Sequence, residues 1–140
     1  MTNASFSGKT ALISGGASGI GLATAQRLIS QGATVWIADI QDTLGQQIAE
    51  EIGANYLHLD VAKEEEWTSA VELIAGQGQG LHLLMNNAGI AIGGTLETQT
   101  TAEFLQTINI NLLGVFLGCK VCAPLLALSG GGSIVNVSSI

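Results

Sequence analysis

The sequence predicts an α/β fold in which a doubly wound parallel sheet is covered by helices on both faces. Apolar segments of strand length alternate along the chain with segments of helical period. These strand segments are apolar on both faces, as in parallel strands buried between two helical layers. A length of 140 residues suits one ordinary domain, so we expect residues 1–140 to share one core.

The expected strands are short apolar runs that end at polar or turn residues. They lie at 10–14 (TALIS), 34–39 (TVWIAD), 55–60 (NYLHLD), 81–86 (LHLLMN) and 133–137 (SIVNV). The expected helices lie between them at 19–31, 42–52, 63–76 and about 100–129. Right-handed crossovers through these helices make the sheet doubly wound.

Local signals support the helix boundaries. Acidic residues 64–66 fall in a first helical turn, where the helix dipole favours negative charge, although a solvated face would explain them equally well. Thr100 and Glu103 have the spacing of a capping box ahead of the longest helix. Pro124 inside that helix predicts a kink or an early end.

The composition limits the classes of partner. Charged residues make up 11% of the chain, against about 25% in ordinary domains, so missing sequence or a subunit interface is expected to cover part of the surface. The four basic residues are scattered and the net charge is −7, which disfavours nucleic acid. The first ten residues lack the apolar core of a leader, and Lys120 interrupts the most apolar stretch. We therefore expect a soluble cytoplasmic protein with no membrane partner.

The cysteines and histidines do not predict a metal site. Cys119 and Cys122 form one C-x-x-C inside a long apolar segment, without the second ligand pair that zinc would need. Two small buried helix residues are the simpler interpretation. His58 and His82 alternate with leucines, which is typical of strand residues.

The glycine-rich turn SGGASGIG at residues 14–21 follows the first expected strand and opens a helix. A pyrophosphate needs such a turn, because side chains must be absent where it approaches the N–H groups of a helix N-terminus. A purely steric turn would also explain the glycines. The second expected strand ends in Asp39, where an acidic group would accept hydrogen bonds from a ribose. Since neither Ser18 nor Ile40 supplies positive charge for a 2′-phosphate, this arrangement favours NAD over NADP.

With these residues, the sequence resembles the short-chain dehydrogenase/reductase family over its whole length. The family's motifs are the glycine turn, with Ser14 where threonine is more usual, NNAG at 86–89, NINLLG at 109–114 and GSIVNVSS at 132–139. Four motifs in one order are far more specific than a glycine turn alone. The resemblance implies a Rossmann-like sheet with strand order 3-2-1-4-5.

The resemblance also implies roles for single residues. The residues implied to bind the cofactor are Gly15, Ser18, Gly19, Ile20 and Gly21 at the pyrophosphate, Asp39 with the neighbouring Ile40 at the adenosine ribose, Asp60 and Val61 at the adenine, and Asn87, Ala88 and Gly89 after the fourth strand. Asn87 would also tie adjacent strands together. Asn111 would anchor a water in a proton relay, and Ser139 would orient a substrate carbonyl. Taken singly, Asp60 could be a turn residue and Asn111 a polar residue satisfied within a helix.

The family's acid/base pair, a tyrosine and lysine in Y-x-x-x-K, is absent from this sequence. Tyr56 is the only tyrosine, and Asp60 is the fourth residue after it. The resemblance therefore implies an NAD-dependent oxidoreductase that transfers a hydride between the nicotinamide and an alcohol or carbonyl substrate, of which these residues are the NAD-binding portion. We expect the 140 residues alone to be inactive. A non-catalytic nucleotide-binding or protein-interaction module is the alternative.

The family topology also makes predictions about association. It leaves the sheet incomplete at its C-terminal edge, so SIVNV at 133–137 becomes an edge strand without charge or proline to protect it. We expect the isolated chain to be poorly soluble, or ordered only as an oligomer or with a complementary half, and the complete protein to be a homo-oligomer.

Overall fold

The computed structural model describes residues 5–139, which form a five-stranded parallel sheet in the order β3-β2-β1-β4-β5. The predicted fold class and strand order are both confirmed. The strands are β1 (Thr10–Ser14), β2 (Thr34–Asp39), β3 (Asn55–His58), β4 (Leu83–Asn86) and β5 (Ser133–Asn136). The helices are α1 (Gly19–Ser30), α2 (Asp42–Ile52), α3 (Glu64–Gly76), α4 (Thr101–Ile108) and α5 (Gly114–Leu128), with the π-helical segment η1 (Asn109–Leu113) joining the last two.

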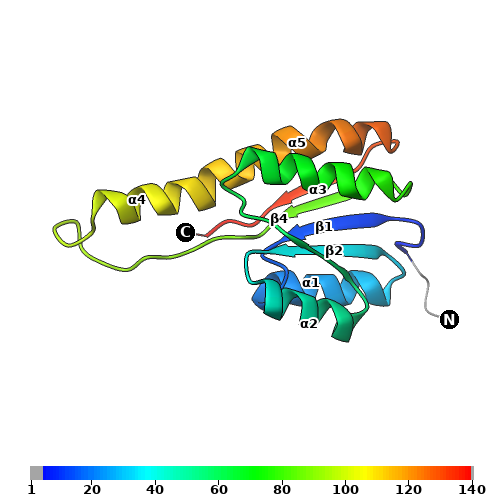
Figure 1. The fold of residues 1–140 in the computed structure, drawn as a ribbon, viewed down its shortest axis with the longest axis horizontal. Coiled ribbons are helices and arrows are strands. Elements are labelled where there is room, and N and C mark those ends of the chain that lie inside the picture. Colours follow the sequence, from blue (N-terminus) through cyan, green and yellow to red (C-terminus); the bar gives the residue numbers. More distant parts are fainter. Residues whose placement is uncertain (1–4, 140) are drawn as a thin grey trace.

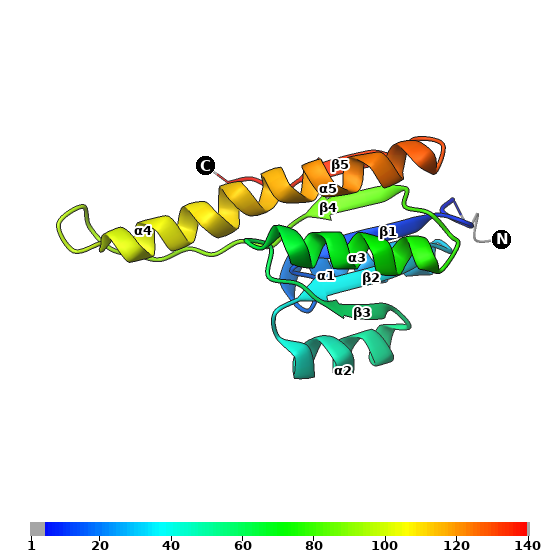
Figure 2. The ribbon, with the colours of Figure 1, turned by 45° about the horizontal axis from the view of Figure 1, so that its top comes forward.

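The sheet lies between two helical layers, with α1 and α2 on one face and α3 and α5 on the other (Figures 1 and 2). Alternate residues of β1 enter the two cores: Leu12 packs with the α3 and α5 side, whereas Ala11 and Ile13 pack with the α1 and α2 side. Every residue of β1 is buried. The central strands are therefore apolar on both faces because both faces are covered.

Three strands are shorter than the sequence predicts: β5 ends at Asn136, one residue early, and β3 and β4 each lose two residues beside polar contacts. β3 ends at His58, and Asp60 forms a turn in which its Oδ1 accepts the N–H of Ala62 at 3.0 Å. β4 begins at Leu83 rather than at residue 81, and the N–H of Leu81 donates to Oγ of Ser129 at 2.9 Å.

The long helix predicted at 100–129 is continuous from Thr101 to Leu128, but its middle is π-helical. The predicted capping box is confirmed: Oγ1 of Thr100 accepts the N–H of Glu103 at 3.2 Å, and the carboxylate of Glu103 accepts the N–H of Thr100 at 2.8 Å. The prediction of an early end at Pro124 is wrong, because α5 continues to Leu128.

By length and composition, the helix Thr101–Leu128 is able to cross a membrane, with a mean hydropathy of 1.9 in its most apolar part. Lys120 therefore does not exclude a span by itself. A core helix of a globular protein meets the same criterion. Here α5 buries Leu117, Cys122 and Leu126 against the core, and Lys120 forms an ion pair with Glu64 on α3.

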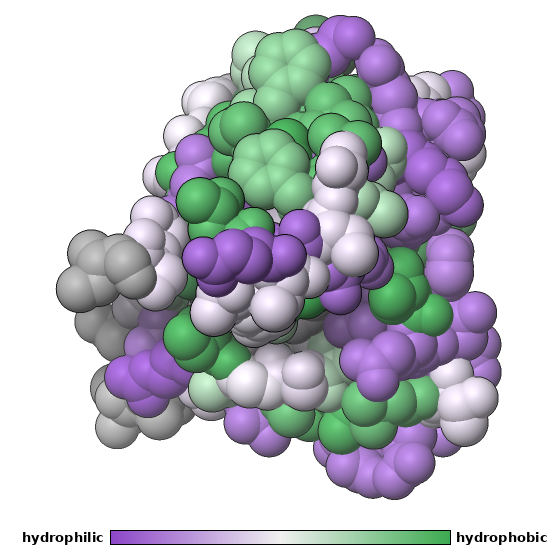
Figure 3. All heavy atoms as spheres, turned by 90° about the vertical axis from the view of Figure 1, so that its left-hand side faces the viewer, coloured by the Kyte–Doolittle hydropathy of each residue, from purple (hydrophilic) through white to green (hydrophobic). Residues whose placement is uncertain are grey.

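The arm, which we define as α4 with η1 (Thr101–Leu113), projects beyond the sheet in both ribbon views (Figures 1 and 2). Neither α4 nor η1 contains a buried residue, and β5, at one edge of the sheet, is exposed throughout. Apolar side chains gather over the projecting helix in Figure 3. The large exposed apolar residues of the long helix are Phe104, Leu105, Leu112, Phe116 and Leu128.

Candidate functional site

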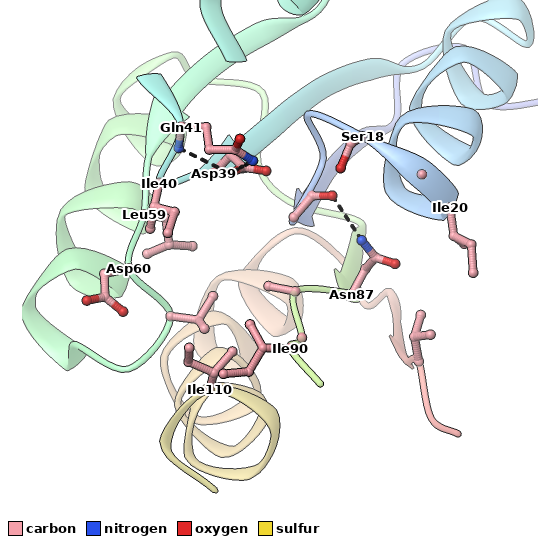
Figure 4. A pocket seen from close by; sticks show the side chains of 16 residues that line it. Ser18, Ile20, Asp39, Ile40, Gln41, Leu59, Asp60, Asn87, Ile90 and Ile110 are labelled. Atoms are coloured by element: carbon pink, nitrogen blue, oxygen red, sulfur yellow. Dashed lines mark hydrogen bonds between the residues drawn. The ribbon is translucent and has the colours of Figure 1, made fainter. Parts of the chain in front are cut away.

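A cavity of about 420 Å³ opens at the carboxyl ends of the strands, where the order of the sheet reverses between β1 and β4 (Figure 4). All the residues that the sequence implied for a cofactor line it, except Gly21. They are Gly15, Ser18, Gly19, Ile20, Asp39, Ile40, Asp60, Val61, Asn87, Ala88 and Gly89. The structure thus brings together residues spread over most of the sequence.

The glycines of the turn after β1 serve two different purposes. A Cβ at Gly15 would lie 2.9 Å from Cα of Ala88, and one at Gly21 would lie 2.5 Å from the carbonyl oxygen of Gly15. These two glycines let the turn pack against the segment after β4. At Gly19, by contrast, the backbone has a φ of +54° and a Cβ would meet no atom within 4 Å. Gly19 leaves open space where α1 begins.

The N-terminus of α1 faces this open space with its N–H groups. Ser18 precedes the helix in an extended conformation, and no side chain caps the helix there. The first N–H groups of an α-helix have no partner within the helix, and the helix dipole places positive charge around them. The start of α1, where Ser18, Gly19 and Ile20 line the cavity, therefore suits a phosphate group.

Asp39 supplies a nearly buried carboxylate at the end of β2. Its Oδ2 accepts the N–H of Ala17 at 3.3 Å, and its Oδ1 accepts from the backbone N–H and the side-chain amide of Gln41 at 3.2 and 3.4 Å (Figure 4). A carboxylate has about four lone-pair positions, so it retains capacity for a further donor such as a hydroxyl. Asp60 is the second carboxylate in the wall, and no lysine or arginine lines the cavity within residues 5–139.

Asn87 ties the segment after β4 to the turn after β1, as predicted. Its side-chain amide donates to the carbonyl oxygens of Ser14 and Gly15 at 3.1 and 3.0 Å. The N–H groups of Asn87 and Ala88 both donate to Oγ of Ser14, at 3.1 and 3.2 Å. A hydroxyl at position 14 is therefore part of the framework of the cavity.

Asp60 and Val61 line the cavity where the chain leaves β3, and both also have structural contacts. Lys63 donates its N–H to the carbonyl oxygen of Asp60 at 3.0 Å, so Asp60 is a turn residue as well as a wall residue. The carbonyl oxygen of Val61 accepts the indole N–H of Trp67 at 3.0 Å, and Trp67 is fully buried. The core thus fixes this wall.

The two residues implied for catalysis do not line the cavity. Oδ1 of Asn111, in η1, accepts the backbone N–H of Ile90, and Nδ2 of Asn111 donates to the carbonyl oxygen of Ile90, each at 2.8 Å. It fixes the segment after Gly89, which is a contact that the resemblance did not imply. Ser139 lies at the exposed end of the described chain, after Val137, which does line the cavity.

Sequence reasoning missed several residues of the cavity wall, namely Gln41, Leu59, Ile90, Ile110 and Val137. Leu59 and Val137 directly follow β3 and β5, so their place after a parallel strand could have indicated them. Gln41, two residues after Asp39, could have been found in the same way. Ile90 and Ile110 carry no comparable signal, because the meeting of the loop after β4 with the long helix depends on the fold.

The cysteines and histidines outside the cavity have ordinary structural places. Burial raises the pKa of the Cys122 thiol to about 12, and Cys119 on the same helix is half-buried. Nδ1 of His82 accepts the N–H of Thr10 at 3.1 Å, and burial lowers the pKa of this histidine. Among the described residues, no group of three or more His, Cys, Asp or Glu side chains is placed to hold a metal ion.

These residues fit a dinucleotide. The start of α1 offers N–H donors to a pyrophosphate, Asp39 offers an acceptor to a diol, and the apolar wall offers contact to a flat ring. Among residues 5–139, the only titratable side chains in the wall are the carboxylates of Asp39 and Asp60. The cavity can therefore bind and orient such a molecule.

Comparison with known proteins shows a consistent set of similarities. The sequence pattern of the family described as "short chain dehydrogenase" matches residues 9–140. A 3-alpha-(or 20-beta)-hydroxysteroid dehydrogenase of Mycobacterium tuberculosis is 42% identical over 135 residues, covering 95% of this chain and 52% of the relative. A trans-4-hydroxycyclohexanecarboxylate dehydrogenase of Sinomonas cyclohexanicum is 42% identical over 143 residues, covering 94% of this chain and 55% of the relative.

A solved structure with the same fold covers a similar share of the chain. The crystal structure of gox2181 superposes with a TM-score of 0.91 at 28% identity, covering 96% of this chain and 55% of that one. The chain thus spans about half the length of the curated relatives and of the solved structure that it matches.

Proposed function

This chain belongs to the short-chain dehydrogenase family, and on that premise we propose that its cavity binds NAD during hydride transfer between an alcohol and the corresponding carbonyl compound. In this proposal, residues 1–140 are the dinucleotide-binding portion. The nicotinamide supplies the carbon that accepts or returns the hydride. The residues of this chain bind and orient the dinucleotide.

The choice of NAD over NADP depends mainly on Asp39. Its carboxylate is buried at the end of β2, so a 2′-phosphate near it would meet a like charge in a partly desolvated place. Asp60 adds a second negative charge to the wall, and no basic residue of the described chain lines the cavity to offset either one. Ribose hydroxyls can instead donate to Asp39.

We assign the remaining implied roles in the same way. Ser139 would orient the substrate carbonyl, and Asn111 would act by holding the segment after Gly89 in place, in addition to any water that its backbone binds. Neither residue can supply the general acid/base catalysis that contributes about 10²–10⁴-fold in rate. The 140 residues alone are therefore expected to bind NAD without turnover.

The relatives suggest the class of substrate. Their names describe dehydrogenases of hydroxysteroids, of a hydroxycyclohexanecarboxylate and of cyclopentanol, which are all alcohols of molecules that contain aliphatic rings. Secondary alcohols of alicyclic molecules are thus the first compounds to assay. A non-catalytic nucleotide-binding module is the second candidate, because the sequence lacks Y-x-x-x-K. NAD-dependent oxidation of such an alcohol by a longer protein that contains this chain would exclude it.

The test of cofactor choice is a calorimetric titration of the chain with NAD⁺ and NADP⁺. We expect NAD⁺ to bind at least about tenfold more tightly, and Asp39→Ala combined with Ile40→Arg to reverse the order. Ile20→Arg is a matched control, because it adds the same charge at another exposed isoleucine of the same cavity. A wild-type chain that prefers NADP⁺ would overturn the assignment of Asp39.

A further inference from the structure

β3, the edge strand beside β2, carries a tyrosine and a histidine whose polar groups reach toward the cavity walls. Residues at alternate positions share one face of a strand, and these two lie two positions apart. In register, Tyr56 is opposite Ile37 and His58 is opposite Asp39. Gly45 of α2 packs on the ring of Tyr56 so closely that no Cβ would fit there. The tyrosine ring is therefore held between the sheet and α2.

The hydroxyl of Tyr56 connects the end of β2 to the start of α2. It lies 2.8 Å from the carbonyl oxygen of Asp39 and 2.6 Å from Oδ1 of Asp42. A phenol has one hydrogen, so the two oxygens share it as acceptors. Burial and the neighbouring Asp42 raise the pKa of Tyr56, while the hydrogen bonds from Tyr56 and then His58 lower the pKa of Asp42. At neutral pH the tyrosine is thus the donor and Asp42 the charged acceptor.

His58 extends this connection to the loop after β3. Its Nδ1 lies 2.8 Å from Oδ1 of Asp42, and its Nε2 lies 3.5 Å from Oε2 of Glu66. The same Oε2 of Glu66 accepts the backbone N–H of Asp60 at 2.6 Å, which is the first cause of the lowered pKa of Glu66. Lys63 holds the other oxygen of Glu66 at 3.1 Å.

We infer that this chain of contacts is a positioning network for the adenosine end of the cavity. We call it the β3 network, and its members are Tyr56, Asp42, His58 and Glu66. One end holds the backbone of Asp39 and the other holds the backbone of Asp60, and both of these residues line the cavity. The network thus fixes the two loops relative to each other before a ligand binds. The role of the network in cofactor binding rests on the proposed NAD function, whereas its contacts are observed independently of that function.

The first experiment measures backbone amide exchange in the chain without ligand. Tyr56→Phe keeps the ring and removes the hydroxyl, so we expect faster exchange at the N–H groups of Gln41 and Ala17, which donate to Asp39. His58→Gln should speed exchange at the N–H of Asp60, which donates to Glu66. Gln47→Ala, on the exposed part of α2, is the control that should change neither. Unchanged exchange in both variants would overturn the network.

The second experiment measures affinity by calorimetry for NAD⁺, for AMP and for nicotinamide mononucleotide. Tyr56→Phe should weaken the binding of NAD⁺ and of AMP about three- to tenfold, which corresponds to the loss of one hydrogen bond. The affinity for the mononucleotide should not change. Equal losses for AMP and for the mononucleotide would overturn the positioning role.

The two experiments separate the inference from the proposed function. If the wild-type chain binds none of the three nucleotides, the proposed function fails, and the exchange experiment still decides whether the network fixes the loops. If NAD⁺ binds and neither AMP affinity nor exchange responds to Tyr56→Phe, the inference fails and the proposed function stands.

Discussion

The central strands and the arm are both rich in apolar residues, yet they use them in opposite ways. Every residue of β1 is buried, and alternate side chains enter two cores. In the arm no residue is buried, and Phe104, Leu105 and Leu112 are each at least half exposed. The loops that form the cavity follow the central strands, so their geometry is set by the part of the molecule with the least freedom to move.

This difference shows which part of the surface lacks charged residues. A chain with 11% charged residues cannot cover its whole surface with charge, and large exposed apolar side chains are concentrated on the long helix (Figure 3) and on β5. The expected self-association of the isolated chain would begin there. Cofactor binding and association are therefore expected to respond to different substitutions.

The largest expected effect is on the free energy of unfolding after Trp67→Ala. Trp67 is fully buried between α3 and the sheet, so its loss should cost about 3–5 kcal/mol. The matched change Phe116→Ala removes an aromatic side chain that is 58% exposed, and it should cost less than about 0.5 kcal/mol. Urea denaturation followed by circular dichroism measures both. Similar costs for the two variants would mean that the exposed surface is packed in solution.

A smaller effect is expected from adding one methyl group at Gly21. The new Cβ would press on the carbonyl oxygen of Gly15 and on the side-chain amide of Asn87, so Gly21→Ala should cost about 1–3 kcal/mol and weaken NAD⁺ binding. Gly76→Ala is the control within the same chain, because a Cβ there meets no atom within 4 Å. It should stabilise the helix end by up to about 1 kcal/mol. Thermal unfolding and calorimetry report the two quantities.

The smallest effect is expected at the start of the arm. Thr100→Ala removes the capping box and should cost about 1 kcal/mol, whereas Thr101→Ala, one residue into the helix, should cost almost nothing. Because the arm has no buried residue, the loss should appear as faster amide exchange within α4 and hardly at all in global unfolding. An equally large increase in amide exchange across the sheet would show that the arm unfolds together with the core.

The same cap predicts a pH dependence for α4. Hydrogen bonds from the backbone and then the side chain of Thr100 lower the pKa of Glu103 below its ordinary value of 4.5. A carboxylate whose pKa is lowered by folding stabilises above its ordinary value, and this stabilisation is lost as the pH falls through the lowered one. Exchange in α4 should therefore rise below pH 4.5 in the wild type and change less in Thr100→Ala.

The parallel sheet, the glycine turn and Asp39 could be predicted from local patterns, because strand length, burial on both faces and the residues at strand ends indicate them. The strand order and the other predicted cavity residues, such as Asn87, came from the resemblance to the family. Ile90 and Ile110 were missed because ordinary apolar side chains carry no chemical signature. Their place in the wall depends on how the loop after β4 meets the long helix.

In the long helix, tertiary packing outweighs the helix-breaking propensity of a proline. Pro124 removes one backbone hydrogen bond, but it lies on the exposed side of α5 while Cys122 and Leu126 are buried against the core. That burial carries the helix on to Leu128. The side-chain amide of Asn111 bonds the backbone of Ile90, a contact that the sequence did not indicate. Its partner is a loop 21 residues away, which no helical period could indicate.

The π-helical segment η1 changes the direction in which side chains point around the axis of the long helix. Gly114 donates its N–H to the carbonyl oxygen five residues earlier, at Asn109, whereas an α-helix bonds four residues back. Successive residues of an α-helix differ by about 100° around its axis, so the side chains before η1 are rotated against the buried stripe of α5 that contains Leu117, Cys122 and Leu126. An insertion or deletion of one residue within 109–113 would thus turn Phe104 and Leu105 to a new direction while that stripe keeps its contacts.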